Sequence, residues 1–227
     1  MILQYVFNVF VSCGLAAAGV LYLDFFSFGK TEKNVLLICR RNKRLLIITA
    51  VFFTIFTYLS TAFAIKRGYT EYSLLRNLFF IYALYVLSVT DIRKKIIPNK
   101  IILFIFIMRF VFLLAEIYYN SEMVSLVLKN AFVGLAISVF VAVVMLLISR
   151  NQMGGGDVKL FALIGFYTGR TNVLSVMMFS FIYAALAGII LMLSKKYKAK
   201  DSIPMAPFVF LGMMTYFILV YFVGLEG

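Results

Sequence analysis

The sequence has no histidine and only two cysteines, Cys13 and Cys39. Histidine is the commonest general base and a frequent metal ligand, so its absence excludes Ser/His/Asp and Cys/His catalysis. The two cysteines form no C-x-x-C pair, since one lies inside an apolar run and the other in a basic loop. We therefore expect no disulfide, no metal site and no cofactor.

Charged residues are also scarce. They make up 14% of the 227 residues, whereas 64% are hydrophobic. A soluble domain is roughly half apolar and could not bury this much apolar surface. The apolar runs are continuous and do not alternate with polar residues, which argues against membrane strands. The sequence predicts an all-α, polytopic membrane protein, organised as a single membrane domain over residues 1–227.

The length of the apolar runs predicts about eight membrane crossings, one of them short. A spanning helix needs about 20 mainly apolar residues. The runs are Ile2–Leu23, Leu45–Ala64, Tyr72–Thr90, Ile101–Tyr119, Asn130–Ile148, Val158–Gly169, Asn172–Ser194 and Pro207–Gly224. The first run lacks the basic start of a cleavable signal, so we expect it to be retained. The short run, Val158–Gly169, needs a backbone shielded by protein or facing a wet cavity.

The distribution of basic residues predicts the topology. The net charge is +13, and most of the 22 lysines and arginines fall in four loops if both termini lie outside. If Val158–Gly169 did not cross, the four lysines between 195 and 200 would face outward, against the positive-inside rule. We interpret the positive charge as contact with anionic membrane lipids and not with nucleic acid.

Two of the nine acidic residues stand out by their position. Asp91 ends the third run and is followed by Ile97-Pro98-Asn99, where the proline disfavours helix at the preceding residue. Asp157 follows three glycines and precedes the short run. Each aspartate alone could be a loop carboxylate or a helix cap.

The predicted topology places Asp91 and Asp157 on the same membrane face, at the boundary between lipid and cytosol. Two facing carboxyl groups are sufficient for aspartic proteolysis. One removes a proton from water, and the other, protonated, donates a hydrogen bond to the scissile carbonyl.

The motifs around these aspartates resemble a known family. Gly154-Gly155-Gly156-Asp157-Val158-Lys159 matches the G-x-G-D signature of intramembrane aspartic proteases. Together with Asp91, Ile97-Pro98-Asn99 and the Pro204–Phe208 segment, it resembles the bacterial type IV prepilin leader peptidases over about residues 75–224. The resemblance implies cleavage of the short basic leader of prepilins or pseudopilins at the cytoplasmic face of the bacterial cell membrane.

The resemblance also assigns residues. It implies that Asp91 and Asp157 are the catalytic pair, and that loop-shaping or substrate-binding positions are occupied by Gly154, Gly156, Lys159, Pro98 and Asn99. Many family members also methylate the new N-terminus with an insert that carries two C-x-x-C pairs. The corresponding loop here, about residues 29–44, is short and has one cysteine. We therefore expect a peptidase without methyltransferase activity.

Some alternatives remain open. Arg109 and Glu116 lie seven residues apart in one helix and share a face, which suits either a structural pair or a substrate channel. A transporter could also use membrane aspartates, although these two lie at the edge and not at the midplane. The sequence determines neither which pilin or pseudopilin is cleaved nor the oligomeric state.

Overall fold

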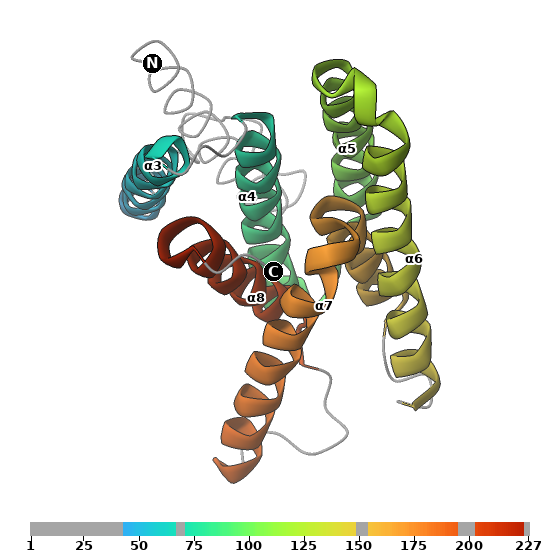
Figure 1. Ribbon diagram of the computed structural model, residues 1–227. Coiled ribbons are helices and arrows are strands. Elements are labelled where there is room, and N and C mark those ends of the chain that lie inside the picture. Colours follow the sequence, from blue (N-terminus) through green and yellow to red (C-terminus); the bar gives the residue numbers. More distant parts are fainter. Residues whose placement is uncertain (1–42, 67–70, 149–153, 195–202, 225–227) are drawn as a thin grey trace. The chain divides into compact units, whose positions relative to one another are not determined.

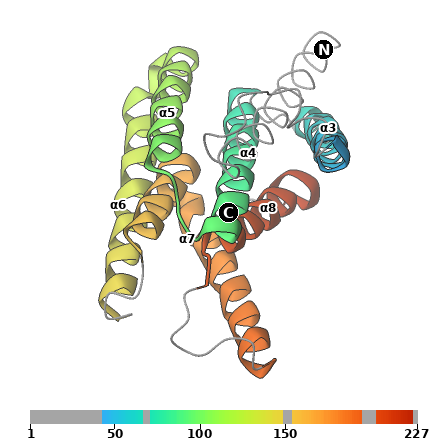
Figure 2. The same cartoon turned by 180° about the vertical axis from the view of Figure 1, so that it is seen from behind.

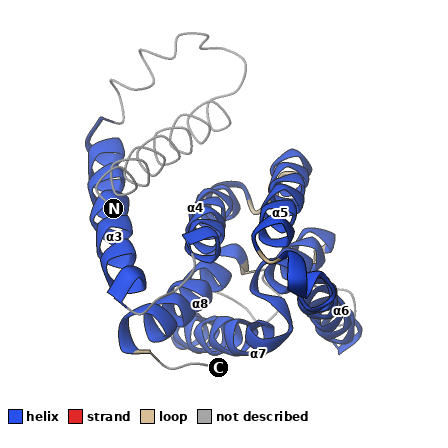
Figure 3. Cartoon of the chain, turned by 45° about the horizontal axis from the view of Figure 1, so that its top comes forward, coloured by secondary structure: helices blue, strands red, loops and turns tan. Residues whose placement is uncertain are grey.

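The computed structural model describes residues 43–66, 71–148, 154–194 and 203–224. Within these ranges all regular structure is helical and no strand is present (Figures 1 and 3). The helices are α3 (Lys43–Lys66), α4 (Glu71–Lys94), α5 (Asn99–Tyr119), η2 (Ser121–Met123), α6 (Val124–Ile148), α7 (Gly155–Leu193), α8 (Ala206–Ile218) and the π-helical turn η3 (Leu219–Val223). The all-α class is confirmed. The first expected crossing, both cysteines and the lysines at 195–200 lie outside the described residues.

Six of these helices are long and apolar enough to cross a membrane: α3, α4, α5, α6, α7, and α8 together with η3. Their outer faces carry large apolar side chains, such as Leu103 at 61% and Phe140 at 70% exposure. Exposed apolar area of this extent is typical of a surface that faces lipid. The structure thus agrees with a multi-pass membrane protein.

The predicted short crossing is one half of a broken helix. Val158–Gly169 and Asn172–Ser194 were expected as separate crossings, and both are parts of α7, which breaks at Gly169. Gly169 has φ 75° and ψ 179°, a conformation open essentially to glycine alone. Asn130 Oδ1 accepts the Arg170 N–H at 2.9 Å directly after the break. The two halves of α7 therefore run in different directions (Figures 1 and 2).

The chain divides into two compact units, with the boundary between Val86 and Leu87 inside α4. In the first unit, α3 packs on the first part of α4. The ring of Phe53 lies 4.4 Å from that of Tyr82, centroid to centroid. The Tyr82 hydroxyl hydrogen-bonds Thr57 and donates to the Phe53 carbonyl at 3.3 Å. Aromatic contacts and a buried polar cluster thus hold these two helices together.

In the second unit, glycines allow close contact between α6 and α7. A Cβ on Gly134 of α6 would lie 2.5 Å from the carbonyl oxygen of Gly165 in α7. The second half of α7 approaches α8 in the same way, since a Cβ on Gly212 would lie 2.8 Å from the Ser180 amide nitrogen. Small residues at such crossings let membrane helices pack by direct backbone contact. This packing fixes α7, the helix that begins at the candidate site, against α6 and α8.

Candidate active site

Asp91 lies near the C-terminal end of α4, and only 4% of its surface is exposed. Its Oδ2 accepts a hydrogen bond from the backbone N–H of Ala206, the first residue of α8, at 3.0 Å. A buried carboxyl group needs such a partner, because burial without a hydrogen bond is costly. The helix end therefore presents Asp91 to the start of α8 and not to bulk water.

The chain turns away from Asp91 within a few residues. The Lys95 amide donates to the Asp91 carbonyl at 2.7 Å, and Lys95 takes a left-handed φ of 51° that ends the helix. Pro98 is buried and forms the extended N-cap of α5. The break that the sequence predicted from Ile97-Pro98 is confirmed.

Asp157 is the third residue of α7 and is half-buried. Its Oδ2 accepts the N–H of Gly154 at 3.2 Å, and its own N–H donates to the Gly154 carbonyl at 3.0 Å. An acidic side chain at this position satisfies an otherwise unpaired amide and faces the positive end of the helix dipole. The predicted location of Asp157 at a helix N-terminus is confirmed.

The segment that follows Asp91 and the segment that carries Asp157 contact each other at two points. A Cβ on Gly156 would lie 3.2 Å from the Ile97 Cβ, closer than side chains normally pack, whereas a Cβ on Gly155 would meet nothing within 4 Å. Lys159 Nζ donates to Asn99 Oδ1 at 2.8 Å. The glycines thus differ in their surroundings: Gly156 allows a close approach, and Gly155 faces open space.

These contacts place the segments that carry Asp91 and Asp157 next to each other. Asp91 lies close enough to Asp157 for its charge to act on it. Two carboxyl groups at close range favour a state in which they share one proton, which provides an acid and a base in one site. Among the described residues, no three histidine, cysteine or acidic side chains group together to hold a metal ion.

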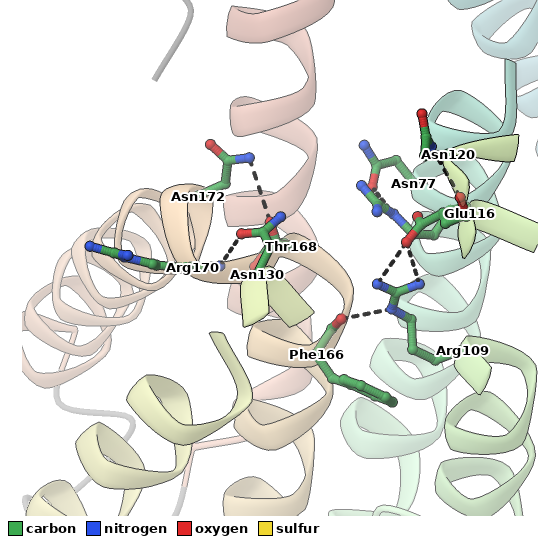
Figure 4. A network of polar contacts seen from close by, with 10 residues as sticks. Asn77, Arg109, Glu116, Asn120, Asn130, Phe166, Thr168, Arg170 and Asn172 are labelled. Carbon is green, nitrogen blue, oxygen red and sulfur yellow. Dashed lines mark hydrogen bonds and ion pairs between the residues drawn. The ribbon is translucent and has the colours of Figure 1, made fainter. Parts of the chain in front are cut away.

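Arg109 and Glu116 lie away from this pair and form a buried cluster of their own. The Arg109 guanidinium contacts Glu116 Oε2 at 3.2 Å, and its Nε donates to the Phe166 carbonyl at 2.7 Å (Figure 4). It also lies 5.3 Å from the centre of the Phe166 ring. The predicted shared face of Arg109 and Glu116 is confirmed. Arg109 also binds another helix, through the Phe166 carbonyl of α7, three residues before Gly169. These contacts agree with the structural interpretation of the pair.

Ser88 is a site residue that the sequence did not indicate. It lies one turn before Asp91 in α4, is 4% exposed, and donates to the Ala206 carbonyl at 2.9 Å. A serine inside an apolar helix is easily explained by a hydrogen bond to a carbonyl of its own helix, so the residue type alone does not indicate a role at the site. Only its spacing of three residues from Asp91 places it on the same face.

Comparison with known proteins gave one family match and one curated relative. Residues 78–193 match the model of the type IV leader peptidase family, a range that lies within residues 75–224 and includes both aspartates. Over 145 residues the chain is 32% identical to the prepilin leader peptidase/N-methyltransferase of Bacillus subtilis (strain 168). The aligned region covers 64% of this chain and 54% of that protein. The chain thus spans about half the length of that relative. No solved structure matches significantly. Since the family model covers half of the sequence, including the segments around Asp91 and Asp157, this chain belongs to the type IV leader peptidase family.

Proposed function

We propose that this protein is a membrane aspartic endopeptidase that removes the short basic leader of prepilins or pseudopilins, with Asp91 and Asp157 as its catalytic pair. The observation that carries the proposal is that the Asp91 carboxyl group of α4 lies close enough for its charge to act on Asp157 of α7, and that each carboxyl group accepts a backbone amide. Membership of the type IV leader peptidase family supports the substrate class.

The proposed reaction is hydrolysis of one peptide bond. One carboxylate removes a proton from a water molecule, and the water oxygen attacks the scissile carbonyl carbon. The other carboxyl group, protonated, donates a hydrogen bond to the carbonyl oxygen. The tetrahedral intermediate then breaks its C–N bond, and the leaving amine takes up a proton from the pair. The reaction uses only the peptide, one water molecule and the two carboxyl groups of the site.

The position of the pair fits a substrate that changes from basic to apolar. Asp91 and Asp157 lie at helix ends, and three exposed basic residues, Arg93, Lys94 and Lys95, follow Asp91 directly in the chain. We propose that this end faces the cytoplasm, where positive-inside topology places basic loops. The apolar part of the substrate would then remain in the membrane while its leader reaches the site.

Methyl transfer is not part of the proposed function. The relative from Bacillus subtilis is named for both activities. In this chain the sequence of residues 29–44 contains a single cysteine, Cys39, and not two C-x-x-C pairs. We propose that the cleaved product leaves with an unmodified N-terminus.

Purified protein in liposomes, incubated with a peptide that joins a short basic leader to an apolar segment, tests the proposal. Mass spectrometry should show one cleavage between the two parts, with no mass gain of a methyl group when S-adenosylmethionine is added. A peptide with the same apolar segment but no leader is the control and should remain intact. Intact leader peptide together with measurable ion flux through the same liposomes would favour the transporter alternative.

A further inference from the structure

The start of α8 is held by α4 at both polar atoms of one residue. The Ser88 hydroxyl donates to the Ala206 carbonyl at 2.9 Å, and the Ala206 N–H donates to Asp91 Oδ2 at 3.0 Å. Ser88, Asp91 and Ala206 are all buried, with exposures of 4%, 4% and 0%. Because Ser88 and Asp91 are three residues apart, one face of α4 makes both bonds.

The Ala206 amide is available to Asp91 because of the residues around it. The first amides of a helix have no partner within the helix and are normally satisfied by the side chain of the N-cap residue. The N-cap of α8 is Met205, which makes no such bond, and Pro207 has no N–H. The amides of Phe208 and Val209 donate to the Met205 carbonyl. Asp91 therefore takes the place of a capping side chain, and it comes from another helix.

This arrangement makes the orientation of Asp91 depend on the position of Ala206. A carboxyl group can rotate about its side-chain bonds, and the hydrogen bond from the Ala206 N–H to Oδ2, supported by the neighbouring Met205 N–H, favours one orientation. The backbone of Ala206 is in turn held by the hydrogen bond from the Ser88 hydroxyl to the Ala206 carbonyl oxygen, in the peptide group that follows the N–H. The buried Ser88 hydroxyl thus influences where the Ala206 N–H lies, and the N–H influences the geometry of the Asp91 carboxyl group. Small displacements of a reacting group have large effects on the reaction rate.

We propose that Ser88 is a positioning residue for Asp91: by holding Ala206, it keeps the Asp91 carboxyl group in the orientation that peptide cleavage requires. The inference rests on the proposed function, because it assumes that Asp91 acts on the substrate. Ser88 itself lies behind Asp91, bonded to the backbone of α8, and is not a catalytic residue.

If Ser88 only stabilised the contact between α4 and α8, its substitution would have a different effect on stability and kinetics. It would lower the melting temperature and reduce activity only in proportion to the loss of folded protein. A positioning residue lowers kcat of the folded enzyme and leaves KM nearly unchanged, because substrate binding does not depend on the orientation of one carboxyl group.

Three substitutions at Ser88 separate these roles. Ser88→Ala removes the hydroxyl, Ser88→Cys keeps the approximate size with a weaker donor, and Ser88→Thr keeps the hydroxyl. We expect Ser88→Ala and Ser88→Cys to lower kcat by about 3- to 10-fold, as for loss of one neutral hydrogen bond, with KM changed by less than about twofold. Ser88→Thr should restore kcat to within about twofold of the wild-type value.

Ser180→Ala is the matched control. Ser180 is also fully buried and faces α8, but its hydroxyl donates to the Val176 carbonyl of its own helix at 2.7 Å. Its substitution should leave kcat unchanged once activity is normalised to folded protein by size-exclusion chromatography. Wild-type kcat in Ser88→Ala, or equal losses in the Ala and Thr variants, would overturn the inference. The Asp91→Asn variant, assayed in parallel, tests the proposed function separately, since cleavage that survives in it would refute the proposed function itself.

Discussion

The ammonium group of Lys159 in α7 donates a hydrogen bond of 2.8 Å to the side-chain oxygen of Asn99 in α5. The two residues are 60 positions apart, and each lies close in sequence to one part of the candidate site: Lys159 is two residues after Asp157, and Asn99 follows the break after Asp91. The bond therefore ties together the two segments that carry the carboxyl groups.

Loss of this bond should impair cleavage modestly. Both residues are exposed, so water can replace either partner, and we expect Lys159→Met or Asn99→Ala to lower kcat/KM by about two- to fivefold. The double variant should be no worse than either single variant, because both remove the same contact. Lys100→Met, at the adjacent exposed lysine, is the control. Additive losses, with KM raised by Lys159→Met alone, would indicate instead that Lys159 binds the substrate directly.

The glycines before Asp157 should differ in their tolerance of substitution. Gly156→Ala forces a new methyl group against Ile97 and should displace the turn that carries Asp157, with a loss in kcat of about tenfold. Gly155→Ala meets open space and should retain activity within about twofold. Cleavage assays on the two purified variants compare them directly. Equal loss in both variants would contradict the assignment of the close contact to Gly156.

The break in α7 should be sensitive to a side chain at Gly169. Gly169→Ala combines a backbone conformation that disfavours alanine with contact against the Asn130 side chain, so we expect a cost of about 1–3 kcal/mol in stability. Gly188→Ala is the control, because a Cβ there would meet only Ile203 at 3.8 Å and alanine favours helix. Thermal unfolding in detergent should show a lower Tm for the first variant only. An unchanged Tm in Gly169→Ala would show that the break tolerates a side chain.

The buried pair of Arg109 and Glu116 predicts an asymmetry between single and double substitutions. Arg109→Met removes the buried ion pair with Glu116 and should destabilise the fold by about 3–5 kcal/mol. Replacing both residues, as in Arg109→Met with Glu116→Leu, should cost less than the single change, because the carboxylate that Arg109 paired with is removed together with it. Thermal unfolding of the three proteins tests this. A double variant less stable than Arg109→Met would contradict it.

The sequence predicted the parts of the site that depend on local signals. Pro98 disfavours helix at the residue before it by its covalent geometry, and Asp157 follows glycines at a helix start, so both positions could be inferred from residue type and spacing. The family resemblance also identified Lys159 and Asn99, although not that they contact each other. Membership of the type IV leader peptidase family, which the residues suggested, is confirmed by the comparisons.

The sequence could not predict the contacts made through the backbone. The carbonyl of Phe166 that binds Arg109 and the amide of Ala206 that binds Asp91 belong to the main chain and leave no mark on composition. The broken form of α7 is a similar case. Gly169 ended an apolar run, but its left-handed φ and its contact with Asn130 depend on the packing of α6.

The proposed function requires that Asp91 and Asp157 together perform the cleavage. Asparagine has nearly the same shape as aspartate but can act neither as the base nor as the acid of the pair, so Asp91→Asn and Asp157→Asn isolate chemistry from packing. The measurement is the single-turnover cleavage rate of a prepilin-like peptide by each purified, folded variant. This requirement predicts that each substitution alone lowers the rate by at least about a thousandfold, with no greater loss in the double variant. A single variant that keeps more than about a tenth of the wild-type rate would contradict it.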